Sequence, residues 1–282
     1  MAPAMRGVLW MGGAVLSFSA MAIAVRELLV RMGAFEVLFL RSAVMLLIVL
    51  ALVSRTGAGV LRARRLGLHA WRNAFHFGGQ ISWIYAIGAL PLATVFAIEF
   101  TMPVWTAVLA FFFLNERLSQ GRVVMLICGV IGVLIILRPG AGTLEPAALL
   151  MLAGALGYAA SMVYVKRIVA HDAPLAVLFW LPVMQAPLAL AFAAPVWVWP
   201  VALDWPWMLL LGGGSYTAHY CMTRAMKIAD ATVVVPIDFA RLPLIAVVAS
   251  VLYGEPLDPM VLVGAALIFA GTYFALRRET RK

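Results

Sequence analysis

Four charged side chains interrupt long apolar stretches of the sequence: Arg41, Glu99, Asp238 and Arg241. If these stretches cross a membrane, each charge costs at least about 2.5 kcal/mol to insert and needs a partner, a water-filled cavity or a function. Glu99 is the strongest functional candidate of the four. Its carboxylate could bind the ammonium group of a substrate, and if it stayed unpaired it could carry a proton.

The positions of these residues predict two ion pairs. Arg41 and Glu99 each lie roughly 10 Å into an apolar stretch that begins on the same side, at 1.5 Å per residue of helix. Asp238 and Arg241 have the i, i+3 spacing that brings side chains together on one helical face. We therefore expect one acid and arginine pair toward each side of the membrane, acting as two gates. The alternative is that both pairs only neutralise themselves and hold helices together.

A third apolar stretch carries a polar stripe. His76, Gln80 and Trp83 have i, i+4 and i+7 spacing, which places them on one face of a helix. A shift of 139 residues takes the first two positions onto Ser215 and His219, so a second stretch carries a matching stripe. We expect both stripes to line a substrate-binding cavity. A packing role for each histidine is the alternative.

Aromatic residues on other stretches could add walls to this cavity. We include Trp105 and Tyr158 in the binding site, although most aromatic residues in such bundles pack or lie at the interface. The sequence has no cluster of His, Cys and carboxylate residues with the spacing of metal ligands. We therefore expect neither a metal nor another cofactor.

The sequence also contains an internal repeat. Ala93 to Leu118 aligns with Thr232 to Leu257 at a shift of 139 residues, with eight of 26 positions identical, and Glu99 falls onto Asp238. Earlier segments match at a shift of 140. Repeats of this kind predict two near-equivalent halves that pack against each other.

Composition identifies the elements that carry these residues. With 65% hydrophobic residues, 12% charged residues and a mean hydropathy of +1.03, the chain is predicted to be an integral membrane protein. The apolar runs are continuous rather than alternating, and an open sheet edge cannot be satisfied in lipid, so the fold class is all-α. Ten runs are long enough to cross a membrane as helices. They lie near residues 7–25, 35–53, 72–90, 92–113, 121–137, 146–165, 174–194, 206–226, 231–253 and 259–276.

The ten spans divide into two repeats, residues 1–143 and 144–282, with five helices each. Because five is odd, the second repeat enters from the opposite side, and the two halves are predicted to be inverted across the membrane plane. Inverted repeats are typical of transporters, since two similar packings can open one central site to either side in turn.

The net charge of +9 has a topological explanation. Sixteen lysine and arginine residues, Arg72 among them, lie at the termini and in the even-numbered connections, and three lie in the odd-numbered ones. This distribution predicts that both termini are cytoplasmic. Nucleic-acid binding is therefore not expected. The densest basic cluster, Arg62, Arg64 and Arg65, is expected to contact lipid head groups.

The ends of the fourth and ninth spans carry related sequences. Leu114 to Leu118 (LNERL) is echoed by Tyr253 to Leu257 (YGEPL), and the glycines Gly132 and Gly271 follow. With ten spans in two repeats, this pattern resembles the EamA-type branch of the drug/metabolite transporter superfamily. Within that branch, the chain is most similar to bacterial exporters of amino acids, including aromatic ones.

The resemblance implies a secondary transporter of the bacterial inner membrane that works by alternating access, not an enzyme. It also implies that Glu116 and Glu255 lie at helix ends and are not substrate ligands. The expected partners are a small-molecule substrate and membrane lipid, with the chain acting as a monomer.

The charged residues favour a zwitterionic substrate. Glu99 would bind its ammonium group, an arginine or a helix N-terminus its carboxylate, and aromatic residues its apolar side chain. We therefore predict export of amino acids, aromatic or large apolar ones in particular. Export of other small metabolites or organic cations remains an alternative, as do a membrane-embedded enzyme using His76 or His219 as a base and a non-transporting scaffold. Phosphorylated substrates are disfavoured, because only two arginines are predicted at membrane depth.

Overall fold

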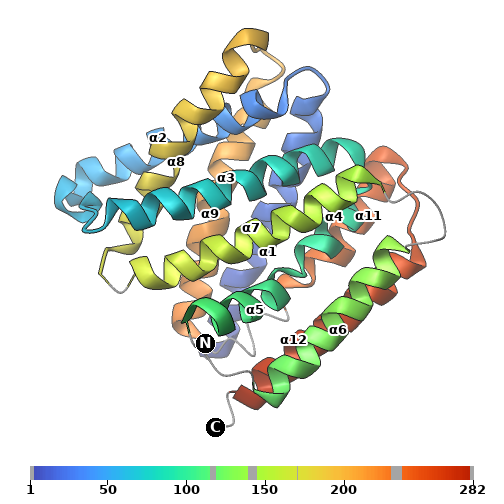
Figure 1. Cartoon of the computed structure of the whole chain (residues 1–282). Coiled ribbons are helices and arrows are strands. Elements are labelled where there is room, and N and C mark those ends of the chain that lie inside the picture. The colour runs from blue at the N-terminus through green and yellow to red at the C-terminus, as the bar shows by residue number, and fades with distance from the viewer. Residues whose placement is uncertain (1–2, 115–118, 139–144, 170, 230–236, 280–282) are drawn as a thin grey trace.

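The structure is a computed structural model of the 282-residue chain and describes residues 3–114, 119–138, 145–169, 171–229 and 237–279. Every regular element within these ranges is helical (Figure 1). The α-helices are α1 (Pro3–Leu29), α2 (Ala34–Thr56), α3 (Leu66–Ala89), α4 (Leu92–Glu99), α5 (Met102–Leu114), α6 (Gln120–Leu137), α7 (Pro146–Ile168), α8 (Pro174–Ala193), α9 (Trp205–Ile228), α11 (Arg241–Tyr253) and α12 (Pro259–Glu279). Two short 3₁₀ helices, η1 (Ala58–Leu61) and η2 (Ala194–Val196), follow α2 and α8.

Seven segments are long and apolar enough to cross a membrane, so the prediction of an all-helical membrane protein is confirmed. One of the seven runs through α4 and α5 as a single segment, Leu92–Phe113. The third and eighth predicted spans correspond to α3 and α9, which are 24 residues long but carry more polar residues, and α11 has 13 residues. The number of ten spans and the side on which the termini lie stay predictions.

The fourth span is broken in the middle. α4 ends at Glu99, Phe100 and Thr101 form a turn, and α5 begins at Met102. The turn still satisfies the backbone, because the Thr101 hydroxyl donates to the Ile98 carbonyl at 2.7 Å. A non-helical turn at membrane depth is tolerated only where protein or water surrounds it, and it often marks a binding site.

A second break occurs at the position that the 139-residue shift predicts. Phe239 and Ala240 form a turn between Asp238 and the first residue of α11, just as Phe100 and Thr101 do after Glu99. The two equivalent rings, Phe100 and Phe239, stack on each other with centroids 4.2 Å apart and planes 15° apart. The two breaks therefore meet inside the bundle.

The main helix contacts join the first half of the chain to the second. α1 packs against α9, α3 against α7, α2 against α8 and α6 against α12, as Figure 1 shows for the last pair. α3 and α7 approach closely because glycines lie at their contact: a Cβ on Gly79 would be 3.0 Å from the Gly154 carbonyl oxygen. Each of these pairs joins one helix of the first half to one helix of the second half, so both halves contribute to the site described below.

Candidate functional site

The two helix breaks bring two acids and one arginine together. Arg241 Nη2 lies 3.2 Å from Glu99 Oε1 and 3.7 Å from Asp238 Oδ2. Trp83 Nε1 donates a hydrogen bond to the other oxygen of Glu99 at 2.8 Å. We call Trp83, Glu99, Asp238 and Arg241 the carboxylate cluster. Its two acids are the equivalent residues of the repeat, one at the end of each broken helix segment.

Aromatic rings surround the arginine of this cluster. The guanidinium carbon of Arg241 is 4.7 Å from the ring centroid of Phe18, 4.9 Å from that of Phe96 and 5.0 Å from that of Phe100. The Arg241 side chain is 6% exposed. Two carboxylates and three ring faces thus compensate a cation that water barely reaches.

This geometry corrects the predicted pairing. Glu99 pairs with Arg241 and not with Arg41, and both acids share one arginine instead of forming two separate ion pairs. The Asp238 and Arg241 contact is present at the expected i, i+3 spacing. Depth along a helix does not determine which helices face each other, and the turn at Phe100 places Glu99 beside α11.

A cavity of about 450 Å³ adjoins the carboxylate cluster. Five methionines and two phenylalanines make its walls largely apolar and adaptable, while the carboxylates supply negative charge. Such a site can hold a cationic group together with a flat apolar one. Its lining residues are Met11, Glu99, Phe100, Met102, Pro103, Met162, Met222, Thr223, Met226, Asp238, Phe239 and Arg241.

The cavity lies toward the end of the bundle that carries the chain termini. Met11 is in the first half of α1, and Met226 is in the last turn of α9, which runs alongside it. Figure 1 shows both chain ends on this side of the molecule.

Polar contacts join helix ends at the opposite end of the bundle. Their arginine, Arg26, lies about 22 Å from Met11 along α1, at 1.5 Å per residue. Glu255 forms an ion pair with Arg26 and accepts the Leu92 N–H at 2.7 Å, which caps the start of α4. Next to it, the Tyr253 hydroxyl donates to Glu27 at 2.8 Å. We call these five residues the Glu255 clamp. It ties the ends of α1 and α11 to the start of α4.

The position of Glu255 at a helix end agrees with the sequence analysis, which did not find its partners. Arg26 was counted only as a loop charge, and the sequence gives no sign that it reaches across to Glu255. Glu116, the counterpart of Glu255 in the first half, lies outside the described residues.

A second group of polar residues gathers between α2, α3 and α9. Arg41 Nε donates to Ser215 Oγ at 3.0 Å, and His219 Nδ1 donates to the Ser215 carbonyl at 2.7 Å. Arg72 and His76 lie one helical turn apart on α3, which packs against α2. We call Arg41, Arg72, His76, Ser215 and His219 the basic cluster. It contains four of the residues predicted to bind substrate or form ion pairs.

Arg72 is a correction to the sequence analysis, which assigned it to a cytoplasmic connection. α3 begins at Leu66, six residues earlier than predicted, and Arg72 is 5% exposed inside the bundle. Its Nη1 donates to Asn73 Oδ1 at 3.0 Å. Among the described residues, three arginines, not two, are therefore buried inside the helical bundle: Arg41, Arg72 and Arg241.

Gln185 was also missed. Its amide nitrogen donates to His76 Nδ1 at 3.1 Å, and its side chain is 1% exposed. The signal was present in the sequence, because a lone amide between Pro182 and Pro187 in an apolar span also carries a desolvation cost, although a smaller one than the carboxylate of Glu99.

The remaining predicted residues differ in their positions. Tyr158 packs edge-on against His76 with ring centroids 5.3 Å apart, so it belongs beside the basic cluster. Gln80 is buried on α3. Trp105 lies half-buried on α5, and no contact described for it joins it to either cluster.

Within the described ranges, no group of three His, Cys, Asp or Glu residues could hold a metal ion.

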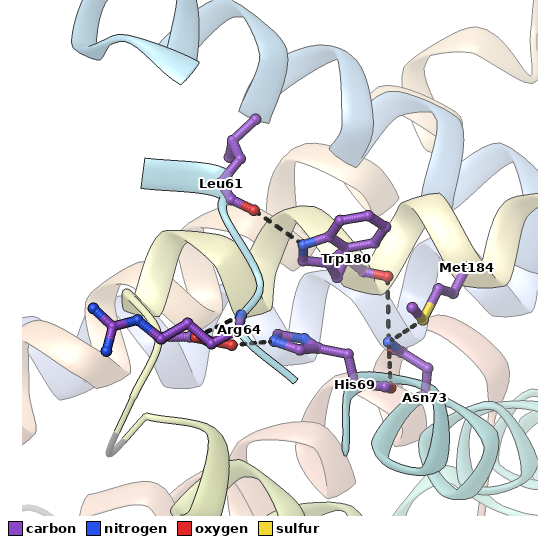
Figure 2. A network of polar contacts seen from close by, with 7 residues as sticks. Leu61, Arg64, His69, Asn73, Trp180 and Met184 are labelled. Carbon is purple, nitrogen blue, oxygen red and sulfur yellow. Dashed lines mark hydrogen bonds and ion pairs between the residues drawn. The ribbon is translucent and has the colours of Figure 1, made fainter. Parts of the chain in front are cut away.

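A further polar network joins the two halves near the start of α3 (Figure 2). His69 Nε2 lies 2.9 Å from Asp172 Oδ2, and the Arg64 N–H donates to Asp172 Oδ1 at 3.0 Å. Trp180 Nε1 donates to the Leu61 carbonyl at 3.0 Å. Burial raises the pKa of the Asp172 carboxyl, but the hydrogen bonds from His69 and Arg64 outweigh it, so the pKa is lowered overall.

Comparisons with known proteins agree with a transporter architecture. The model of the EamA-like transporter family matches residues 5–138 and again residues 145–277. The chain is 28% identical over 275 residues to the S-adenosylmethionine uptake transporter of Rickettsia bellii, covering 98% of this chain and 94% of the relative. It is 28% identical over 291 residues to the riboflavin transporter of Vibrio cholerae, covering 99% and 95%.

A more distant relative transports in the outward direction according to its name. The pseudopaline exporter CntI of Pseudomonas aeruginosa is 24% identical over 264 residues, covering 93% of each chain. A solved crystal structure superimposes with a TM-score of 0.66 at 21% identity, covering 95% of this chain and 97% of the other. The chain therefore shares its fold with a known structure over almost its full length.

Proposed function

Because the chain belongs to the EamA-like transporter family and is a multi-pass protein of the bacterial inner membrane, we propose that it carries a small zwitterionic metabolite by alternating access. The observation that carries this proposal is the cavity at the carboxylate cluster, which lies toward one end of the bundle while the Glu255 clamp closes the other. A single site with one closed side is what one half of a transport cycle requires.

The packing supports two inverted five-helix repeats, residues 1–143 and 144–282. Under the repeat, the contact of α1 with α9 is equivalent to that of α7 with α3, and both are extensive. The pairs α2 with α8 and α6 with α12 are equivalent to themselves, as helices next to a two-fold axis would be. The stacked Phe100 and Phe239 would then lie near this axis. The family model also matches each half separately.

Ten spans with both termini in the cytoplasm fit the distribution of basic residues. With that orientation, the cavity faces the cytoplasm and the Glu255 clamp closes the outer side. Transport then requires the clamp to open and the cytoplasmic side to close, which exchanges the packing of one half against the other.

The relatives widen the class of substrate beyond amino acids. Their names specify S-adenosylmethionine, riboflavin and pseudopaline, so amino-acid export is one candidate among small metabolites. The site supports a substrate with a cationic group for Glu99 and Asp238 and a flat ring for Phe100 and the methionines. S-adenosylmethionine has both features. An aromatic amino acid also has them, because it carries an ammonium group and a ring.

Flux measurements in proteoliposomes test this proposal. Purified protein should take up labelled S-adenosylmethionine or phenylalanine faster than empty vesicles and should release the probe chemically unchanged. Converted product would favour a membrane-embedded enzyme. Binding without flux would favour a non-transporting scaffold, and absence of flux for every probe would contradict the proposed substrate class.

A cross-link across the Glu255 clamp tests alternating access. Cys128 and Cys221 are first replaced by alanine, and cysteines are introduced by Arg26→Cys and Glu255→Cys. Because the long arginine and glutamate side chains meet at their tips, the shorter cysteines need a spacer, and a bismaleimide with a reducible disulfide in its linker can join them. Cross-linking should stop transport and reduction should restore it, because the clamp must open in each cycle. The single Arg26→Cys variant is the control, since it cannot form the bridge. Full transport with the bridge formed would reject the clamp as a gate.

A further inference from the structure

Arg41 and Arg72 have no counter-charge within the described part of the chain. Arg41 is 2% exposed and Arg72 is 5% exposed, and neither has a carboxylate within ion-pair distance among the described residues. Arg41 lies on α2 and Arg72 on α3, and these two helices pack against each other and against α8. Burying two like charges in this way is costly, so a retained pair calls for an anion that binds there.

Within the described residues, most of the hydrogen-bond donors of this pair are unused. Each guanidinium carries five N–H donors. Arg41 gives one hydrogen bond, from Nε to Ser215, and Arg72 gives one, from Nη1 to Asn73. Arg72 Nε is buried and has no hydrogen-bond partner among the described residues. The unused donors of two arginines match the two or more acceptor oxygens of a carboxylate or phosphate group.

We infer that Arg41 and Arg72 form a subsite for the oxyanion of the transported substrate, while the carboxylate cluster binds its cationic end. This inference rests on the proposed function and makes it more specific. Tyr158 lies on α7 and packs against His76 of the basic cluster, and α7 also contacts α4, which ends at Glu99 of the carboxylate cluster. A substrate that reaches from one cluster to the other would place its cationic group at the carboxylate cluster and its oxyanion at Arg41 and Arg72. Purely cationic or neutral metabolites would leave the arginine subsite empty.

A pair of probes that differ only in the carboxylate tests the subsite on the unmodified protein. S-adenosylmethionine carries this group and its decarboxylated form lacks it. In proteoliposomes, the carboxylated probe should have a KM lower by at least about tenfold, the effect of losing strong charge-assisted hydrogen bonds. Equal KM values for the two probes would overturn the inference.

Variants test whether the difference in KM between the two probes arises at Arg41 and Arg72. Arg41→Met and Arg72→Met should raise the KM for S-adenosylmethionine by about tenfold or more and leave that for the decarboxylated probe unchanged. Arg224→Met, which removes an exposed arginine stacked on Trp10, is the matched control and should change neither. A similar change for both probes in the two buried-site variants would mean that the arginines act only on structure.

A binding measurement separates this inference from the proposed function. In detergent, acetate or inorganic phosphate should raise the Tm of the wild-type protein, relative to chloride at equal ionic strength, by more than it raises the Tm of the Arg41→Met/Arg72→Met double variant. If no probe is transported but this Tm difference persists, the proposed function fails and the subsite stands. If probes are transported but neither the Tm nor the KM responds to the oxyanion, the subsite is rejected and transport stands.

Discussion

Arg241 and the pair Arg41 and Arg72 are buried to a similar degree but have opposite surroundings. Arg241 is compensated from within the protein, by Glu99, Asp238 and three aromatic rings. Arg41 and Arg72 have neutral hydrogen-bond partners, Ser215 and Asn73. The cost of burial is the same in kind at both places. The comparison therefore distinguishes a charge that the fold can hold by itself from charges whose compensation must come from a ligand.

The largest effect should follow removal of the compensated cation. Arg241→Met leaves Glu99 and Asp238 facing each other without a counter-charge, which should cost about 3–5 kcal/mol of stability. Arg41→Met removes an uncompensated charge and should leave stability unchanged or improved. The measurement is the Tm of both variants in the same detergent. Equal losses of Tm would show that the two sites do not differ as the contacts indicate.

The next effect concerns the two acids that share Arg241. Glu99→Gln keeps an oxygen for the Trp83 hydrogen bond but removes the charge, so transport of a cationic probe should fall by about tenfold or more. Asp238→Asn should reduce it less, because Asp238 contacts Arg241 at 3.7 Å and its Oδ1 has no partner among the described residues. Initial rates at matched protein content test the order. The reverse order would make Asp238 the principal substrate ligand.

A smaller effect should follow loss of the hydrogen bond to Arg41. Ser215→Ala removes the partner of Arg41 Nε, which should cost about 1 kcal/mol of stability. Ser19→Ala is the matched control, since the Ser19 hydroxyl is buried without a partner in the described chain and its loss should cost nothing. Thermal unfolding of the two variants gives the difference. If both lose the same stability, the contact with Arg41 contributes nothing.

The sequence identified individual polar residues within the apolar spans better than it identified the partners that those residues contact. Glu99, Arg241 and His76 were found because a polar side chain in an apolar run carries a desolvation cost wherever the helix packs. The partner of Glu99 was wrong, because a pairing depends on which helices are adjacent and on the turn at Phe100. Arg72 was placed in a loop because polar residues lowered the apparent apolarity of the first turns of α3.

The fold shows the same division. The run at 146–165 was predicted and α7 spans Pro146–Ile168, since an apolar run and the cost of unsatisfied backbone in lipid leave helix as the stable choice. The Glu255 clamp was not predicted, because Arg26 and Glu255 are 229 residues apart and meet only through packing of α1 against the second half.

The smallest expected effect concerns Asp172, which lies between α7 and α8 and contacts His69 in the first turn of α3. Because its pKa in the folded protein is lowered, Asp172 stabilises the fold at pH values above its unfolded pKa of about 3.9, and this contribution is lost as the pH falls through the folded pKa. Asp172→Asn should therefore lower the Tm near neutral pH, and the difference from wild type should shrink below about pH 4. Scans from pH 7 to the acid limit of stability measure it. A difference that stays constant with pH would mean that Asp172 acts through its hydrogen bonds alone, and that compensation of charge matters only for the buried arginines.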